Sequence, residues 1–269
     1  MHVGIFESVF NRPTLSEQFN AVAAAGFASV QFHYASAGLE SEPTVIPDRV
    51  AKHVRRDADE SGIRIAAVSG AFNMIHPEPA VREHGLTSLE AIAATCDALG
   101  TSIVTLCTGT RSTVSQWTFH PDNVLDDAWD DLLDTLDAAL EIADKYHVTL
   151  AFEPEPANVA RNAGIARRLL DAFDHSPLKI ILDPANIIAS DRERPPETVL
   201  SDAFDLLGDS IVLAHAKDLS TAGEFCPAGT GVVPWKLYRS LLERTGFEGD
   251  VIFHSLAEHD VALAISSFA

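Results

Sequence analysis

The 269-residue sequence has few cysteines, few basic residues and no long apolar run. Its three cysteines, Cys96, Cys107 and Cys226, are odd in number and widely spaced, which excludes a disulfide framework and a Cys-x-x-Cys site. Cys96 falls in a helical pattern and Cys107 ends an apolar strand, so we expect both thiols to be buried and unreactive. No apolar run reaches the about 20 residues that cross a bilayer, so we expect no membrane partner.

Basic residues are scarce relative to acidic ones. Nineteen lysines and arginines oppose 39 aspartates and glutamates, which gives a formal net charge of −20. Such a charge repels a phosphate backbone, so we expect no nucleic-acid partner. Many of the acids lie in residues 126–134, where Leu132, Leu136 and Leu140 continue an apolar stripe at helical spacing. We expect these acids to form the solvated face of a helix.

We expect neither a secretory leader nor an internal linker. Residues 1–6 already have the pattern of a strand, with no basic segment and no cleavage site, so we expect a cytoplasmic protein. No break in composition divides the sequence. We therefore expect one domain over residues 1–269.

Short apolar runs alternate with helical patterns along the whole chain. The expected strands are residues 3–6, 29–32, 63–69, 103–107, 148–152, 179–182, 211–214 and 251–253. The helices that follow them are residues 14–25, 48–61, 80–99, 125–146, 163–173, 197–207, 235–245 and 257–268. Eight such pairs predict an α/β fold, a single (β/α)8 TIM barrel. The alternative, a doubly wound sheet, normally has a glycine-rich nucleotide turn after its first strand, and Phe6-Glu-Ser-Val9 is not one.

Long connections follow the first four expected strands, over residues 7–13, 34–47, 70–79 and 108–123. All of them leave the carboxyl ends of strands, where TIM barrels place their functional sites. We therefore expect the site at that rim of the barrel.

The last four expected strands each end in a carboxylate or an imidazole: Glu153, Asp183, His215 and His254. Parallel strands bring these four side chains to one rim, and carboxylates with neutral imidazoles suit Mn, Co, Fe, Zn or Mg. The alternatives are an ion pair for Glu153, an ordinary Asp-Pro turn for Asp183, and core positions for the two histidines. Basic residues near Glu153 are scarce, so the pattern as a whole favours a divalent metal site.

The chain resembles the xylose-isomerase-like TIM barrels, a superfamily of sugar isomerases and epimerases, inosose dehydratases and endonuclease IV. The segments that carry the resemblance run in family order from the fifth strand to the last: Glu153, Asp183-Pro-Ala-Asn186, His215-Ala-Lys217-Asp218, Gly229-Thr-Gly231 before Trp235, and Gly249-Asp-Val-Ile-Phe-His254. His-x-Lys-Asp and Gly-x-Gly together are fairly specific, whereas either alone is weak.

The resemblance implies one divalent metal held by a Glu, an Asp, a His and a final Glu, with the two glutamates moving a proton through an enediolate. Glu153, Asp183 and His215 match, but His254 stands in place of the final Glu, with Glu258 four residues later. A histidine can bind the metal and titrate near neutral pH, so a Glu153/His254 acid–base pair remains open. A weakened or repurposed site is the alternative.

Other polar residues at the same rim are candidates for substrate binding. They are Asn73, His76, Glu155, Asn158, Asn186 and Lys217. Lys217 would stabilise an oxyanion or pair with an acid. The roles of other residues stay open. His33 lies either in the core or in the pocket, and the loop around Trp117, Phe119 and His120 forms either a lid or packing on the barrel mouth. Gly229 and Gly231 could cradle a phosphate.

The leading hypothesis is a metal-dependent isomerase or epimerase of a small sugar, sugar phosphate or cyclitol. The alternatives are a lyase or dehydratase that uses the same metal site on a keto-sugar or inosose, and a non-catalytic sugar-binding barrel with a degenerate site. A DNA-repair nuclease shares the fold but conflicts with the net charge. The resemblance also makes a homo-oligomer an open expectation. The fold itself does not choose the substrate.

Overall fold

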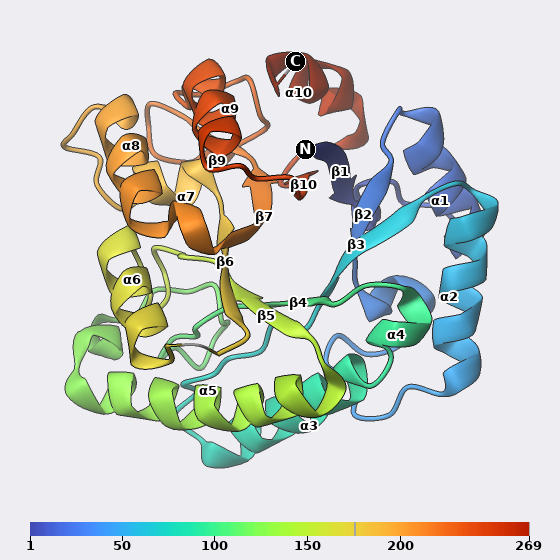
Figure 1. Cartoon of the computed structure of the whole chain (residues 1–269), viewed down its shortest axis with the longest axis horizontal. Coiled ribbons are helices and arrows are strands. Elements are labelled where there is room, and N and C mark those ends of the chain that lie inside the picture. Colours follow the sequence, from blue (N-terminus) through green and yellow to red (C-terminus); the bar gives the residue numbers. More distant parts are fainter. Residues whose placement is uncertain (175, 269) are drawn as a thin grey trace.

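The computed structural model, which describes residues 1–174 and 176–268, is a closed barrel of eight parallel strands (Figure 1). The strands are β1 (His2–Phe6), β2 (Ser29–Phe32), β3 (Arg64–Ser69), β4 (Ile103–Leu106), β5 (Thr149–Phe152), β6 (Leu178–Leu182), β7 (Ile211–Ala216) and β10 (Asp250–Phe253). Pairing of β1 with β10, with Val3 opposite Val251, closes the ring. The predicted single (β/α)8 barrel is confirmed.

Helices surround the barrel in sequence order (Figure 1). They are α1 (Leu15–Ala24), α2 (Asp48–Glu60), α3 (Pro79–Ala93), α4 (Cys96–Leu99), α5 (Asp126–Tyr146), α6 (Ala163–Ala172), α7 (Pro184–Ala189), α8 (Pro196–Leu207), α9 (Trp235–Arg244) and α10 (Val261–Phe268). Short 3-10 turns are η1 (Glu7–Val9), η2 (Tyr34–Ala37), η3 (Pro121–Val124), η4 (Gly208–Ser210) and η5 (Glu258–Asp260). The start of α1 follows from its sequence, because the Thr14 hydroxyl accepts a hydrogen bond from the Glu17 amide at 3.2 Å.

The apolar side chains form two separate clusters. The larger one lies between strands and helices and contains residues such as Phe32, Leu150 and Phe253. The smaller one is made by Ala66, Ala67, Ala151, Ile181, Leu213 and Ile252. Successive side chains of a strand point to opposite faces, so these residues alternate with outward-packed ones, except at Ala66 and Ala67, where the pairing of β2 with β3 shifts register, and they fill the barrel interior.

Several elements differ from the sequence prediction. The helix expected over 80–99 is divided into α3 and α4, where the Thr95 hydroxyl donates to the Ile92 carbonyl at 2.7 Å and competes with the helical pattern. The helix expected over 257–268 begins only at Val261, after η5. Apart from the 3-10 turns, three elements were not predicted: α7, and the antiparallel pair β8 (Asp218–Leu219) and β9 (Phe225–Cys226).

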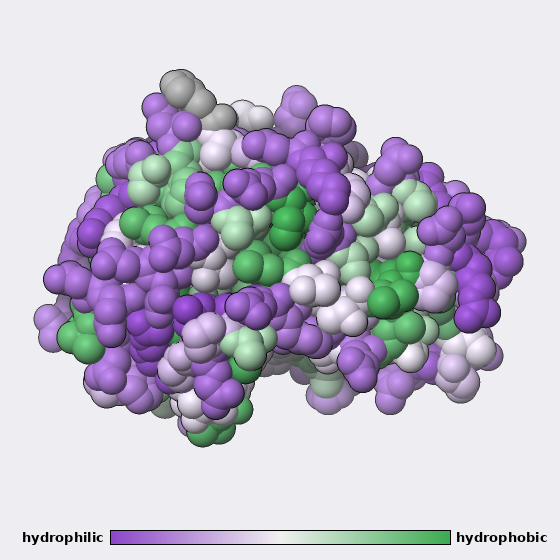
Figure 2. All heavy atoms as spheres, turned by 90° about the horizontal axis from the view of Figure 1, so that it is seen from below, coloured by the Kyte–Doolittle hydropathy of each residue, from purple (hydrophilic) through white to green (hydrophobic). Residues whose placement is uncertain are grey.

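The acidic stretch at the start of α5 lies at the surface, as predicted. Asp126, Asp127, Asp130 and Asp134 are exposed, whereas Leu132 and Leu136 are buried. Seen from the side of α3 and α5, hydrophilic side chains cover most of the molecule and hydrophobic ones form separate patches (Figure 2). Among the described residues, no helix combines the length and the apolar character that spanning a membrane requires.

Candidate metal centre

On four strands, the inward-facing side chains are followed at the carboxyl end by a carboxylate or an imidazole. Each of these polar residues lies two positions after a residue that fills the barrel interior. Glu153 follows Ala151, Asp183 follows Ile181, His215 follows Leu213, and His254 follows Ile252. Because side chains two positions apart point to the same side of a strand, all four project toward the barrel axis at the carboxyl rim. His215 lies within β7, which extends two residues further than predicted.

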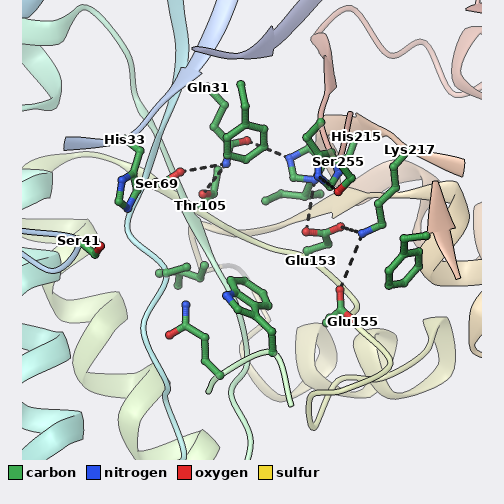
Figure 3. A pocket seen from close by; sticks show the side chains of 18 of the residues that line it. Gln31, His33, Ser41, Ser69, Thr105, Glu153, Glu155, His215, Lys217 and Ser255 are labelled. Carbon is green, nitrogen blue, oxygen red and sulfur yellow. Dashed lines mark hydrogen bonds and ion pairs between the residues drawn. The ribbon is translucent and has the colours of Figure 1, made fainter. Parts of the chain in front are cut away.

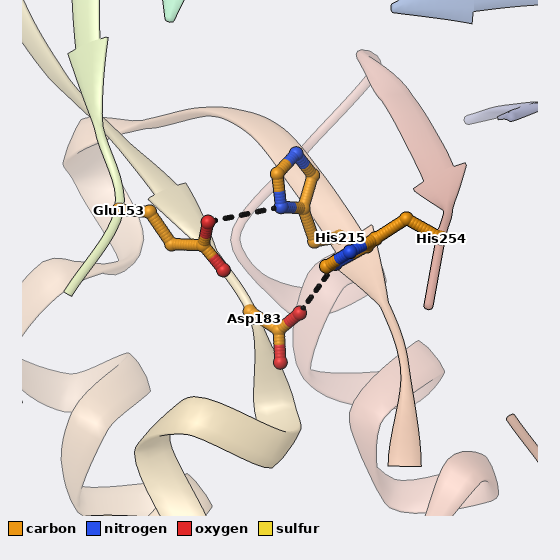
Figure 4. Close-up of side chains that lie close together, drawn as sticks. All are labelled: Glu153, Asp183, His215 and His254. Atoms are coloured by element: carbon orange, nitrogen blue, oxygen red, sulfur yellow. Dashed lines mark hydrogen bonds and ion pairs between the residues drawn. The ribbon is translucent and has the colours of Figure 1, made fainter. Parts of the chain in front are cut away.

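The four side chains converge closely (Figure 4). One ligand atom from each lies within 4.8 Å of the others. The Nδ1 atom of His215 is 3.3 Å from Oε2 of Glu153, and Nε2 of His254 is 3.0 Å from Oδ2 of Asp183. Oδ1 of Asp183 accepts the amides of Ala185 and Asn186 at the start of α7, which directs Oδ2 toward the cluster.

A residue from a strand that does not neighbour β7 holds His215 across the barrel interior. Oε1 of Gln31, on β2, lies 2.9 Å from Nε2 of His215. The Gln31 amide nitrogen donates to the hydroxyls of Ser69 at 3.1 Å and Thr105 at 3.2 Å (Figure 3). With its nitrogen used in this way, Gln31 presents its oxygen as an acceptor, so the His215 proton resides on Nε2.

The donor set fits a divalent metal. Nδ1 of His215 is buried and forms no hydrogen bond among the described residues, although Oε2 of Glu153 lies only 3.3 Å away, so its lone pair and the carboxylate both face the cluster. A buried polar atom normally has a partner, and a metal would supply one. Two imidazoles and two carboxylates are ligands that Zn, Fe, Co and Mn share.

Lys217 adds a buried positive charge beside the cluster. Its ammonium is 3.6 Å from Oδ2 of Asp183, 3.7 Å from Oε1 of Glu153 and 4.0 Å from Oε2 of Glu155, and it lies 4.3 Å from the centre of the Phe225 ring. Burial alone lowers the pKa of Lys217, but the three carboxylates outweigh it and hold the pKa above its usual value. The side chain therefore stays charged and pairs with acids.

The carboxylates respond differently to burial. Burial alone raises the pKa of Glu153, but the interactions with His215 and Lys217 outweigh it and hold the pKa below its usual value. The pKa of Asp183 lies well below its usual value, because Lys217 and His254 outweigh burial. In contrast, burial raises the pKa of Glu155 to about 7, and the nearby charges of Glu153 and Asp183 add to this effect. Glu153 is thus an ionised base, whereas Glu155 exchanges a proton near neutral pH.

His254 does not titrate near neutral pH, contrary to the sequence-based expectation. Burial lowers the pKa of His254 to about 4, and the hydrogen bond to Asp183 offsets this only partly. The imidazole is therefore neutral near pH 7, which is the form that binds a metal.

Asn186 links the cluster to Glu155. Its amide nitrogen donates to Oε1 of Glu153 at 2.7 Å and to Oε2 of Glu155 at 2.8 Å. The orientation of both carboxylates therefore depends on α7, the short helix that Asp183 caps.

Four of the expected substrate-binding residues, Asn73, His76, Asn158 and Asn186, do not line the central cavity. The Asn73 amide bonds to the backbone of Thr110, with its nitrogen 2.9 Å from the carbonyl oxygen and its oxygen 2.8 Å from the amide. Asn158 accepts from the Gly109 amide and donates to the Gln116 carbonyl. Nδ1 of His76 accepts the Glu78 amide. In this structure Asn73 and Asn158 hold loops together, and their amide groups are already used.

The cluster opens into a cavity of about 570 Å³ at the carboxyl rim (Figure 3). Residues from most parts of the rim line it: Phe6, Gln31, His33, Ser41, Glu42, Ser69, Ala71, Thr105, Leu106, Gln116, Trp117, Glu153, Glu155, Ile181, His215, Lys217, Phe225, His254 and Ser255. His33, left open between core and pocket, faces the pocket, and Trp117 lies beside it. Phe119 and His120 are not among the lining residues, and the His120 imidazole caps η3.

The glycine loop after β9 surrounds a carboxylate of the protein itself. The Asp218 carboxylate accepts the amides of Gly229 and Val233 and the indole N–H of Trp235, at 2.9 to 3.1 Å. A Cβ on Gly231 would collide with the Leu219 carbonyl and with Asp218, so only glycine allows this approach. The amides that the sequence left open as a phosphate cradle are thus bonded to Asp218.

Sequence reasoning missed Gln31, Ser69 and Thr105. Each is a polar residue within a strand, at a position that alternation directs inward. That alternation was the available signal, since a buried polar side chain needs a partner inside the barrel.

Comparison with known proteins places the chain in a family. The sequence profile described as xylose isomerase-like TIM barrel matches residues 19–263. No curated protein sequence matches the chain. Among solved structures, 3-keto-D-glucoside 4-epimerase from E. coli superposes with a TM-score of 0.77 at 18% identity, over 99% of this chain and 97% of the other.

Two further solved structures are similar over nearly the full length. The probable 3-DHS dehydratase AsbF of Bacillus anthracis gives a TM-score of 0.74 at 14% identity, over 100% of this chain and 97% of the other. The IolI protein with a zinc atom gives 0.74 at 15% identity, over 99% and 96%. At such identities the similarity establishes the fold alone. The profile match, which spans most of the sequence, establishes that the chain belongs to the xylose isomerase-like TIM barrel family.

Proposed function

We propose that the protein is a metal-dependent isomerase or epimerase of a small carbohydrate or cyclitol. Glu153, Asp183, His215 and His254 hold the metal, and Glu153 moves the proton. The observation that carries the proposal is the convergence of the four ligand atoms within 4.8 Å, with Nδ1 of His215 buried and lacking a hydrogen-bond partner in the described part of the chain.

Proton transfer at a carbon next to a carbonyl needs a base and a means to hold the negative charge of the resulting enediolate. A bound divalent metal supplies Lewis acidity toward the carbonyl and its neighbouring hydroxyl. Glu153 is ionised and lines the cavity, so its carboxylate takes the proton from the carbon between them. Lys217, which stays charged at 3.7 Å from Glu153, stabilises oxyanion character on the same side.

The proton then returns from one of two sides. If Glu153 returns it to the neighbouring carbon, the reaction is an isomerisation. If a group on the other face returns a proton, the reaction is an epimerisation, and His254 lies at the opposite end of the cluster from Glu153 (Figure 4). Because the pKa of His254 is about 4, its imidazole is neutral near pH 7 and has no imidazolium proton to deliver, which favours transfer by Glu153 alone.

A lyase is the second candidate. The similarity to a probable dehydratase supports it, as does Glu155, whose pKa of about 7 suits a group that protonates a departing hydroxyl. After Glu153 removes the proton, loss of water replaces proton return. A product lighter by one water, seen by mass spectrometry, distinguishes this reaction from the mass-neutral isomerisation.

The first test is the metal content of protein purified without added metal. We expect about one equivalent of a transition metal in the wild type and its loss in the Glu153→Ala/Asp183→Ala double variant. The exposed acids Glu83 and Asp130 provide a matched control, since replacing both with alanine leaves the cluster untouched. A wild-type protein that contains no metal and does not bind Mn, Co or Zn on titration would contradict the proposal.

The second test is solvent exchange. Incubation of the metal-loaded protein with keto-sugars and inososes in D2O should introduce deuterium into a converted sugar. A protein that binds the metal and a sugar but neither converts the sugar nor exchanges its protons would instead be a sugar-binding barrel.

A further inference from the structure

The cavity extends well beyond the candidate metal centre. His33 and Ser41 lie across it from Glu153 and Lys217 (Figure 3). Glu42, Gln116 and Trp117 also line it and come from the connections after β2 and β4, whereas the metal cluster comes from β5, β6, β7 and β10. We call His33, Ser41, Glu42, Gln116 and Trp117 the distal wall.

The volume exceeds what a single sugar ring at the metal needs. The cavity measures about 570 Å³. Cavities of roughly 300–1,000 Å³ enclose ligands of drug-like size. A ligand bound at the cluster therefore leaves space beside the distal wall for a second group.

The charges around the cavity disfavour an anionic ligand. Of the described residues, Lys217 is the only lysine or arginine lining it, and its charge already faces Glu153, Glu155 and Asp183 within 4.0 Å. The distal wall carries the carboxylate of Glu42 and no cationic partner for a phosphate. The glycine loop cannot compensate, because the amides of Gly229 and Val233 are bonded to Asp218.

The part of the distal wall with Gln116 and Trp117 is held in place before any ligand binds. Asn158 donates to the Gln116 carbonyl at 2.9 Å, and the Thr110 hydroxyl donates to the Thr118 carbonyl at 2.8 Å. The backbone is thus fixed on both sides of Trp117, a residue that is 53% exposed. An indole in this position offers an apolar face to the C–H groups of a sugar ring, and the Glu42 carboxylate accepts hydrogen bonds from hydroxyls.

We infer that the distal wall is a second binding subsite for an uncharged, hydroxyl-bearing group attached to the reacting sugar. The substrate is then a neutral glycoside or disaccharide rather than a sugar phosphate. The inference rests on the proposed function, because it places the reacting ring at the metal cluster. It adds the size and the charge of the substrate, which the metal cluster does not specify.

The test is calorimetric titration of the full-length, metal-loaded protein with three groups of probes. They are neutral disaccharides (cellobiose, maltose, lactose and trehalose), their monosaccharides (glucose and galactose), and the corresponding 6-phosphates. We expect at least one disaccharide to bind at least about tenfold more tightly than its monosaccharides and than either phosphate. A phosphate that binds most tightly, or a panel in which no disaccharide exceeds its monosaccharides, overturns the inference.

Variants test whether the distal wall causes the tighter binding of disaccharides. Trp117→Ala should weaken disaccharide binding about tenfold and leave monosaccharide binding unchanged. Phe119→Ala is the matched control, since Phe119 is similarly exposed on the same loop but does not line the cavity. Glu42→Gln is a second test variant on the distal wall. Its matched control is Glu40→Gln, which changes an exposed residue outside the cavity. Equal effects of Trp117→Ala on both classes of sugar would contradict a second subsite.

Failure of this inference is distinguishable from failure of the proposed function. If the protein is not a metal-dependent enzyme, the elemental analysis shows this before any sugar is added. A protein that holds its metal and prefers a phosphate retains the proposed function and refutes only the neutral two-part substrate.

Discussion

Gln31 on β2 and His215 on β7 meet inside the barrel, with Oε1 of the glutamine 2.9 Å from Nε2 of the imidazole. This contact fixes the proton on Nε2 and leaves Nδ1 facing Glu153, Asp183 and His254. A hydrogen bond to the second nitrogen of a metal-binding histidine orients the ring and raises its basicity. Gln31 is therefore a positioning residue for the candidate metal site.

Gln31→Leu should weaken metal binding by about 10- to 100-fold, because the imidazole loses the acceptor that selects its tautomer. Gln31→Glu keeps an acceptor at the same place and should retain most of the affinity. Competition with a chelator gives the dissociation constants, and 15N NMR of the imidazole reports the tautomer directly. A leucine variant with wild-type affinity and an unchanged tautomer would show that Gln31 only fills space.

His254→Glu should shift the metal preference. Imidazole favours Zn and Co relative to Mg and Mn, whereas an additional carboxylate favours the harder cations. We expect the preference for Zn over Mn to decrease about tenfold, measured as the ratio of the two dissociation constants. His259→Glu introduces the same change at an exposed side chain five residues later and should leave the ratio as it is. An unchanged ratio in His254→Glu would exclude His254 as a ligand.

Glu7 should make stability depend on pH. Its carboxyl is fully buried in η1, and burial raises its pKa from 4.5 to about 7, although hydrogen bonds from Ser36 and the His33 amide oppose the shift. Below pH 4.5 the group is protonated in both states. Between pH 4.5 and 7 the unfolded chain releases a proton that the folded protein keeps, so stability falls as the pH rises, and above about pH 7 the loss is complete.

Glu7→Gln removes this dependence. From acidic to mildly alkaline pH, the wild type should lose about 3 kcal/mol of unfolding free energy relative to the variant. Urea unfolding at a series of pH values measures it, with Glu83→Gln, an exposed acid on α3, as the control. A difference that is constant with pH would mean that Glu7 ionises normally in the folded protein.

The three thiols should differ in reactivity. Burial raises the pKa of Cys96 and of Cys107 to about 12, whereas Cys226 in β9 is only half-buried. Because the thiolate is the reactive form, alkylation of the native protein at neutral pH should modify Cys226 alone. Mass spectrometry should show one adduct in the native wild type, none in native Cys226→Ser, and three in the denatured wild type. Native labelling of Cys96 or Cys107 would contradict their buried positions.

The sequence by itself determined the barrel and the ends of its last four strands. Apolar runs of strand length, separated by helical stripes, predict parallel strands, and the period-2 alternation directs Glu153 and Asp183 to the same side as Ala151 and Ile181. The cap at Thr14 was equally local, since its contact spans three residues. Such features depend on neighbours along the chain, so their residue types are sufficient to recognise them.

Only the tertiary structure decided which polar side chains serve the cavity and which hold the loops. Asn73, Asn158 and Asn186 are the same residue type in similar connections, yet two bond to backbone and the third orients Glu153 and Glu155. Burial in the assembled rim likewise gave His254 its low pKa and Glu155 its high one. Gln31 and His215 are 184 residues apart, and their contact exists only because the closed barrel holds β2 and β7 around a common interior. No local pattern encodes such a pairing, because it depends on how distant strands are arranged around the ring.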